Sequence, residues 1–232
     1  MVGLFHALIT LHIAVGTLGL LTFWVPVLAR KGGWPHIRWG RVFIWCMLVN
    51  GALAFGISCI TLADPLGTHP KIPDAALVRG IFGWMMMYLG ILTVNLAWFG
   101  WMCVLNQRNH PANRAWPNMA LQVLVVLAAL NCVVQGWLIG QPLMLGISTI
   151  GFATGATNLR FMLRRKVMPG DWQYEHLKGL VGAGISVYTA FFAFGAVHTF
   201  PELALNPVLW SVPLVVGLSI IFWHWWRLWR MG

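Results

Sequence analysis

Charge is what this chain has least of. Only 9% of its residues are charged, against roughly a quarter in an average soluble domain. Hydrophobic residues make up 59% of the chain, and its mean hydropathy is +0.75. This composition argues against an ordinary soluble enzyme. It also argues against nucleic acid as a partner, despite the formal net charge of +10. It predicts an integral membrane protein in contact with the lipid bilayer.

The few charges lie outside the middle third of every long apolar segment. A helix that crosses the hydrocarbon core needs about 20 apolar residues, and we identify seven such segments. They comprise residues 4–29, 42–62, 81–105, 117–139, 143–163, 177–200 and 208–228. None shows the two-residue alternation of a barrel strand, so we expect helices. The chain is predicted to be an all-α, polytopic transmembrane bundle of seven spans, with residues 1–232 forming a single membrane domain.

The basic residues are distributed unevenly between the two sides of this bundle. All except Lys71 and Arg79 fall in the first, third and fifth connections or in the C-terminal tail. Lys and Arg are enriched in cytoplasmic loops. The pattern therefore predicts an outside N-terminus and a cytoplasmic C-terminus, in a multi-pass protein of the bacterial inner membrane.

Reactive groups are also scarce. The 4 cysteines lie inside predicted spans without metal-type spacing, and we interpret them as packing residues. No nucleophile–base pair or carboxylate dyad is evident, so no enzymatic activity follows from the sequence. The polar residues within the spans are mainly amides, which we interpret as hydrogen-bonding contacts between helices. They are Asn50, Asn95, Gln122, Asn131 and Asn158.

The 8 histidines are predicted to lie at two heights in the membrane, with none at the middle. The outer set comprises His6, His12, His69 and His198, and the inner set comprises His36, His110, His176 and His224. Imidazoles from two facing helices can ligate a haem iron, and two stacked haems would carry an electron across the bilayer. Individually, each histidine is also compatible with a packing or surface role.

This layout predicts two pairs of haem ligands. His12 with His198 forms the outer pair, with His6 as a substitute ligand. His36 or His224 with His176 forms the inner pair, and Arg38, Arg41 or Lys178 would meet the haem propionates. The expected cofactor is haem b, with a quinone as a further candidate. Copper bound by Met85, Met86 or Met87 together with His6 or His12 is an alternative.

Two short blocks resemble a known family. The segment His36-Ile-Arg-Trp-Gly-Arg-Val-Phe and the segment from Glu175-His176 to Phe191 resemble blocks of the bacterial membrane proteins catalogued as domain of unknown function 2306. The resemblance implies an architecture and draws attention to His36 and His176. It implies no reaction.

Three functions remain open at this point. The first is haem-based or quinone-linked electron transfer across the membrane. The second is a non-catalytic accessory or assembly subunit of a larger membrane complex. The third is a carrier for a neutral solute, although transporters usually hold an ionisable group at mid-depth.

Overall fold

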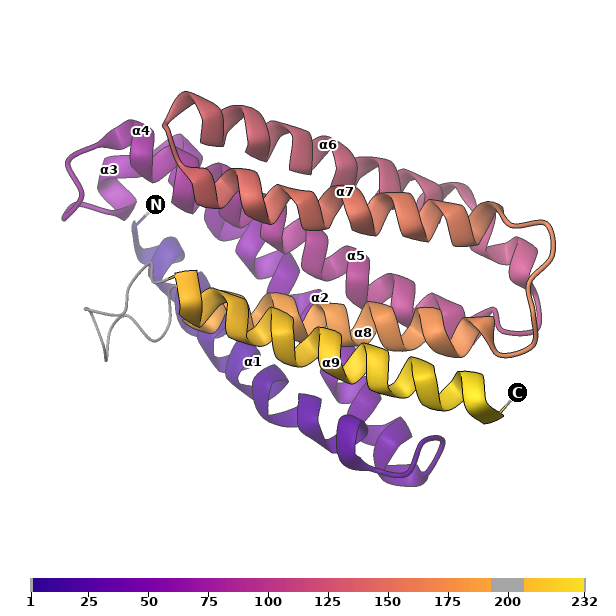
Figure 1. The fold of residues 1–232 in the computed structure, drawn as a ribbon. Helices are drawn as coiled ribbons and strands as arrows, with labels where there is room; N and C mark the ends of the chain where they lie inside the picture. The colour runs from indigo at the N-terminus through magenta and orange to yellow at the C-terminus, as the bar shows by residue number, and fades with distance from the viewer. Residues whose placement is uncertain (1, 193–206, 232) are drawn as a thin grey trace.

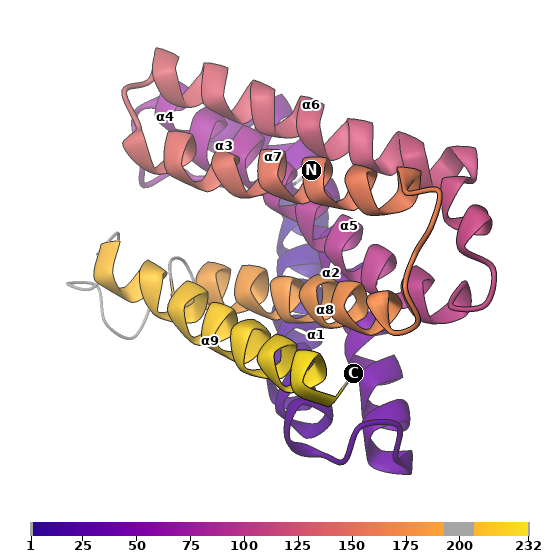
Figure 2. The ribbon, with the colours of Figure 1, turned by 45° about the vertical axis from the view of Figure 1, so that its right-hand side comes forward.

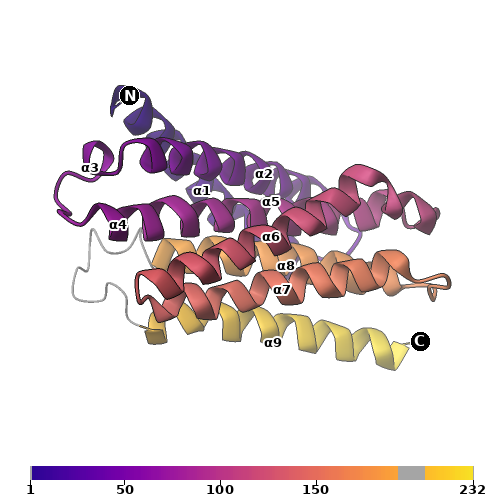
Figure 3. The same cartoon turned by 90° about the horizontal axis from the view of Figure 1, so that it is seen from above.

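The computed structural model describes residues 2–192 and 207–231, and within these ranges the chain is helical without any strand. The long helices form a bundle (Figures 1 and 3), in which α1 and α2 are inclined to α6, α7, α8 and α9 (Figure 2). They are α1 (Val2–Leu28), α2 (Trp34–Ala63), α5 (Met86–Leu105), α6 (Trp116–Leu138), α7 (Pro142–Leu163), α8 (Asp171–Ala190) and α9 (Pro207–Met231). The predicted helical class is therefore confirmed.

Short elements occur in two of the connections. The helices α3 (Pro65–Thr68) and α4 (Ala75–Val78) follow α2, and a π-helical stretch η1 (Arg79–Met85) continues directly into α5. A 3-10 turn η2 (His110–Arg114) precedes α6. Carboxylates begin both α3 and α4: Asp64 accepts a hydrogen bond from the Gly67 amide, and Asp74 accepts from the amides of Ala76 and Leu77.

Four helices in the described ranges are long and apolar enough to cross a membrane. They are α1, α2, the continuous helix Ala75–Leu105 and α6. Each of the other predicted spans also lies on a long helix, although α8 ends at Ala190 and the part of its predicted span from residue 193 lies outside the described residues. The structure therefore supports a membrane protein, and the crossing of seven helices remains a prediction.

Three helices begin clearly before the apolar segments suggest, and one of them is the continuous helix that begins at Ala75 rather than residue 81. The helix α2 begins at Trp34 rather than residue 42, after Gly33 and with Pro35 in its first turn, a position that proline favours. The helix α8 begins at Asp171 rather than residue 177. His36, Arg38 and His176 thus lie on helices and not in loops. The long apolar segments identified the part of each helix that is compatible with lipid and missed its polar first turn.

The connections that carry most of the basic residues gather at one end of the bundle. The α1–α2, α5–α6 and α7–α8 connections and the C-terminus share that end (Figure 1). The N-terminus, the α3–α4 region and the α6–α7 turn lie at the opposite end. The segregation of charge expected from the sequence is therefore present in space.

The helix α5 lies at the centre and contacts α2, α6 and α8. Glycine pairs make two of these contacts unusually close. A Cβ atom added to Gly51 of α2 would lie 2.7 Å from the Gly90 oxygen of α5, and one added to Gly179 of α8 would lie 2.8 Å from the Gly100 backbone. Such contacts bring helix backbones together, as small residues do in membrane proteins generally.

We predict that Gly179→Val destabilises the protein by about 1–3 kcal/mol, because the new side chain overlaps the α5 backbone. The matched control is Gly146→Val, since a Cβ atom on Gly146 meets nothing within 4 Å. Thermal unfolding in detergent, followed by circular dichroism, should show a lower midpoint for the first variant only. Equal midpoints would contradict the close α5–α8 contact.

Candidate functional site

The structure brings His36 and His176 together at the basic end of the bundle. His36 lies in the first turn of α2 and His176 in the second turn of α8. Their ring centroids are 6.3 Å apart, and the ring planes are inclined at 71°. Both side chains are half-buried. The pair is thus formed by residues 140 positions apart, on two helices that both pack against α5.

A backbone carbonyl holds each of the two rings. Nδ1 of His176 lies 2.8 Å from the carbonyl oxygen of Gly100, and Nδ1 of His36 lies 3.0 Å from the carbonyl oxygen of Pro26. A carbonyl oxygen only accepts hydrogen bonds, so Nδ1 is the donor in both rings. In a neutral imidazole this leaves the lone pair on Nε2. No hydrogen bond to either Nε2 is formed by the part of the chain that the structure describes.

The two carbonyls are available for different reasons. Pro26 belongs to the last turn of α1, where carbonyl groups lack partners within the helix. Gly100 lies within α5, and its bare backbone is exposed to α8 at the contact with Gly179. The close glycine contact therefore places the Gly100 oxygen within reach of His176. Local helix geometry and tertiary packing together determine the orientation of the pair.

Lys31 supplies positive charge beside the pair. Its Nζ atom donates to the carbonyl oxygens of Pro26 and Val27, at 2.8 and 2.6 Å, and so caps α1. The same ammonium group is close enough to act electrostatically on both His176 and His224. Desolvation lowers the pKa of Lys31 itself. The sequence analysis did not single out this lysine, because a loop lysine carries no distinguishing pattern.

The arginines expected at this site lie elsewhere. Arg38 stacks over the ring of Trp34, 4.9 Å from its centroid, and Arg41 is exposed. No described contact joins either of them to the histidine pair. Lys178 forms an ion pair with Glu175 and donates to Thr157 on α7. Two or five residues along a helix turn a side chain to a different face, which explains why Arg38 and Arg41 do not follow His36.

His224 contacts the neighbouring Trp223 ring, at 4.7 Å between centroids. Its shared proximity to Lys31 places it near the pair, although no ring contact with His36 or His176 is present in the described ranges. Of the two alternatives for the inner pair, the structure therefore brings His36, rather than His224, against His176.

The outer pair is not assembled by the described residues. His198 lies outside them. His6 bonds only to the carbonyl of Val2 in its own helix, at 2.8 Å. His12 lies 3.3 Å from the backbone oxygen of Asn50, near the middle of α2. His12 is therefore deeper in the bundle than expected, since α1 begins at Val2 and its eleventh residue is well inside the helix.

The copper alternative with the methionine run stays a prediction. Met85 is fully buried at the end of η1. Among the described residues, no group of three or more His, Cys, Asp and Glu side chains is arranged to hold a metal ion. The two-imidazole set at His36 and His176 is instead the kind of ligand set that a haem iron uses.

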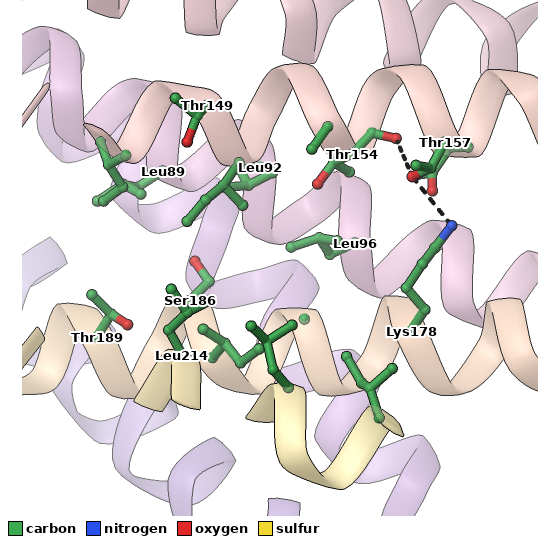
Figure 4. A pocket seen from close by; sticks show the side chains of 18 of the residues that line it. Leu89, Leu92, Leu96, Thr149, Thr154, Thr157, Lys178, Ser186, Thr189 and Leu214 are labelled. Atoms are coloured by element: carbon green, nitrogen blue, oxygen red, sulfur yellow. Dashed lines mark hydrogen bonds between the residues drawn. The ribbon is translucent and has the colours of Figure 1, made fainter. Parts of the chain in front are cut away.

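A second feature was missed by the sequence analysis. A cleft of about 790 Å³ lies between α7 on one side and α8 with α9 on the other, over a floor of Leu89, Leu92 and Leu96 from α5 (Figure 4). In Figure 2, α6 and α7 form one pair of helices, and α8 and α9 form a second pair opposite α7. Most of the lining is apolar, and Lys178 reaches into it from α8 toward Thr157.

The cleft borders a buried amide network. Asn158 of α7 donates to Oδ1 of Asn95 at 3.3 Å and to Oε1 of Gln122 at 3.1 Å. Asn95 in turn donates to the Leu121 oxygen. The proposed role of these amides as contacts between helices agrees with these bonds. The sequence offered no sign that three of the amides would meet, because they come from three different helices.

Comparison with known proteins finds no matching family model, no similar curated protein and no matching solved structure. The resemblance to domain of unknown function 2306 stays a prediction.

We predict that His36 and His176 carry their hydrogen on Nδ1, because both Nδ1 atoms face carbonyl oxygens. His110 is the internal control: its Nε2 faces the Arg164 oxygen at 3.1 Å and its Nδ1 faces the Asn113 amide group at 3.2 Å. Two-bond ¹⁵N–¹H spectra of histidine-labelled protein should show Nδ1–H for the pair and Nε2–H for His110. An Nε2–H tautomer at His176 would contradict the geometry.

Proposed function

We propose that this protein is an integral membrane electron-transfer protein that holds one b-type haem between His36 and His176. The observation that carries the proposal is the paired imidazoles, each with its Nδ1–H group held by a backbone carbonyl. Ligating histidines characteristically donate their other ring N–H to such a group, which sets the tautomer and the ring orientation. Here both His36 and His176 donate Nδ1–H to a backbone carbonyl, and the two rings lie side by side.

The separation of the rings suits two ligands of one metal. The ring centroids lie 6.3 Å apart, so both imidazoles would be able to hold one group placed between them. The donor set also suits iron, because haem iron takes its axial ligands from histidine and its remaining ligands from the porphyrin. When bound, the haem would supply reversible one-electron transfer.

Lys31 has a distinct role in this proposal. Its ammonium group acts on His176 at the basic end of the bundle, so it is a cation that a propionate could pair with. This role replaces the one predicted for Arg38 and Arg41. The backbone oxygen of Pro26 links Lys31 to the histidine pair, because it accepts hydrogen bonds from both Lys31 and His36.

The membrane setting is supported by the outer faces of the helices. Large apolar side chains there are widely exposed, including Leu21 at 69%, Trp137 at 77% and Leu28 at 79% of their surface. In water such a surface would be unfavourable, whereas acyl chains solvate it. The proposal is a seven-span bundle in the bacterial inner membrane, with its basic end and the histidine pair on the cytoplasmic side.

We expect purified protein reconstituted with haem to show a Soret band and a b-type pyridine haemochrome. Both His36→Ala and His176→Ala should lose at least nine-tenths of the bound haem, because each removes one of the two histidines that would hold it. His110→Ala is the control, since His110 lies at the same end but bonds to Arg164. Wild-type protein that binds no haem would refute the proposal, and unchanged spectra in both variants would refute the ligand assignment.

Cysteine labelling tests the orientation and the number of crossings. In a background without the exposed Cys59, single cysteines at Lys71 and Gly140 should react with an impermeant maleimide on intact cells. Cysteines at Asn109 and Lys166 should react only after lysis, because an intervening helix places them on the other side. Equal labelling at Gly140 and Lys166 would show that α7 does not cross.

A further inference from the structure

The cleft between α7 and the α8–α9 pair has the dimensions of a site for a single long apolar chain. Its lining on α7 extends from Leu143 to Asn158, which corresponds to about 22 Å at 1.5 Å per residue. Its volume of about 790 Å³ lies within the range of sites for small organic ligands. The lining is overwhelmingly apolar along this length, with leucines and isoleucines from all four surrounding helices.

The amide, ammonium, phenol and indole groups of the lining lie at one end of the cleft, whereas the polar groups along the rest of it are serine and threonine hydroxyls. Asn158 and Thr157 come from α7, Tyr174 and Lys178 from α8, and Trp225 from α9. Figure 4 shows the Lys178 side chain reaching across toward Thr157, with 3.3 Å between Nζ and the threonine oxygen. A ligand in the cleft would therefore place its polar group at this end and its tail toward Leu143.

The charge of Lys178 is already compensated. Its ammonium group forms an ion pair with the buried carboxylate of Glu175 and lies over the ring of Phe99. An ammonium group has three N–H donors, and the described contacts to Glu175 and Thr157 use two of them. The polar end thus offers a hydrogen-bond donor without a net charge. This favours a neutral polar group over a phosphate or carboxylate.

Asn158 offers the complementary acceptor. Its side chain is fully buried, and its amide nitrogen is bonded to Asn95 and Gln122. Its Oδ1 atom has no hydrogen-bond partner among the described residues. Buried acceptors of this kind are normally satisfied. Asn158 lines the cleft, and once its side chain turns toward the cleft a ligand that carries a hydroxyl group would supply the missing donor.

We propose that this cleft binds an isoprenoid quinol, with its ring at the polar end and its tail along α7. A quinol hydroxyl can donate to Oδ1 of Asn158, and a ring oxygen can accept from Lys178. The flat ring also suits the aromatic side chains of Tyr174 and Trp225. A neutral head with both a donor and an acceptor, on one long chain, matches each of the features above.

The position of the cleft connects it with the histidine pair. Lys178 and His176 lie in the same turn of α8, Lys178 directed to the cleft and His176 to α5 and α2. A two-electron carrier would therefore be held across one helix from the proposed haem. In this respect the inference rests on the proposed function. Binding in the cleft itself requires only the membrane setting.

The test is equilibrium binding of decylubiquinol under anaerobic conditions to the purified full-length protein, measured by equilibrium dialysis. Ala153→Trp should weaken binding at least tenfold, because Ala153 is exposed to the cleft and indole fills the path of the tail. Ala156→Trp is the matched control, since Ala156 is exposed on the same helix but does not line the cleft. Size-exclusion profiles of both variants establish that they are folded.

Asn158→Leu and Lys178→Met should also weaken binding at least tenfold, which would locate the ring. Phosphatidylcholine nanodiscs that contain either phosphatidylglycerol or diacylglycerol provide the competing ligands. Displacement of the quinol by phosphatidylglycerol alone, or equal affinity of the two tryptophan variants, would overturn the proposal. Soret absorbance with no quinol binding would overturn this inference alone. Quinol binding without haem would overturn only the haem assignment.

Discussion

The close contact between α5 and α8 at Gly100 and Gly179 is the constraint on which the candidate site depends. Without side chains at these positions, the two backbones approach until the Gly100 oxygen faces α8. That oxygen then accepts the hydrogen bond from His176 and sets its tautomer. Side chains at the same positions would separate the helices and leave the imidazole without its partner. The close packing of α5 and α8 therefore determines the tautomer of His176.

The helix α8 serves two environments. One of its faces carries His176 toward α2 and α5, and another carries Lys178 and Ser186 into the cleft. Because residues two apart on a helix point in very different directions, a short segment can supply both sites. The apolar interior between them excludes water and strengthens each polar interaction. The proposed haem and the proposed quinol are neighbours for this geometric reason.

Buried amides make the interior more specific than its apolar composition suggests. Asn95, Gln122 and Asn158 come from α5, α6 and α7 and bond to one another. Isolated amides in an apolar interior are costly, so this network favours one arrangement of the three helices. Asn158 itself lines the cleft, so the network borders it.

Composition and periodicity alone determined that the chain is helical, where its long helices lie and which ends are basic. These properties depend on each residue and its neighbours in the sequence, so they can be predicted without knowledge of the fold. The helix starts at Trp34 and Asp171 escaped prediction because their first turns are polar. The sequence predicted that His176 would pair with either His36 or His224, but only the tertiary structure selected His36. It also separated Lys178 from the pair and created the cleft. Those outcomes depend on which helix faces meet, and that is decided by packing between segments far apart in the chain.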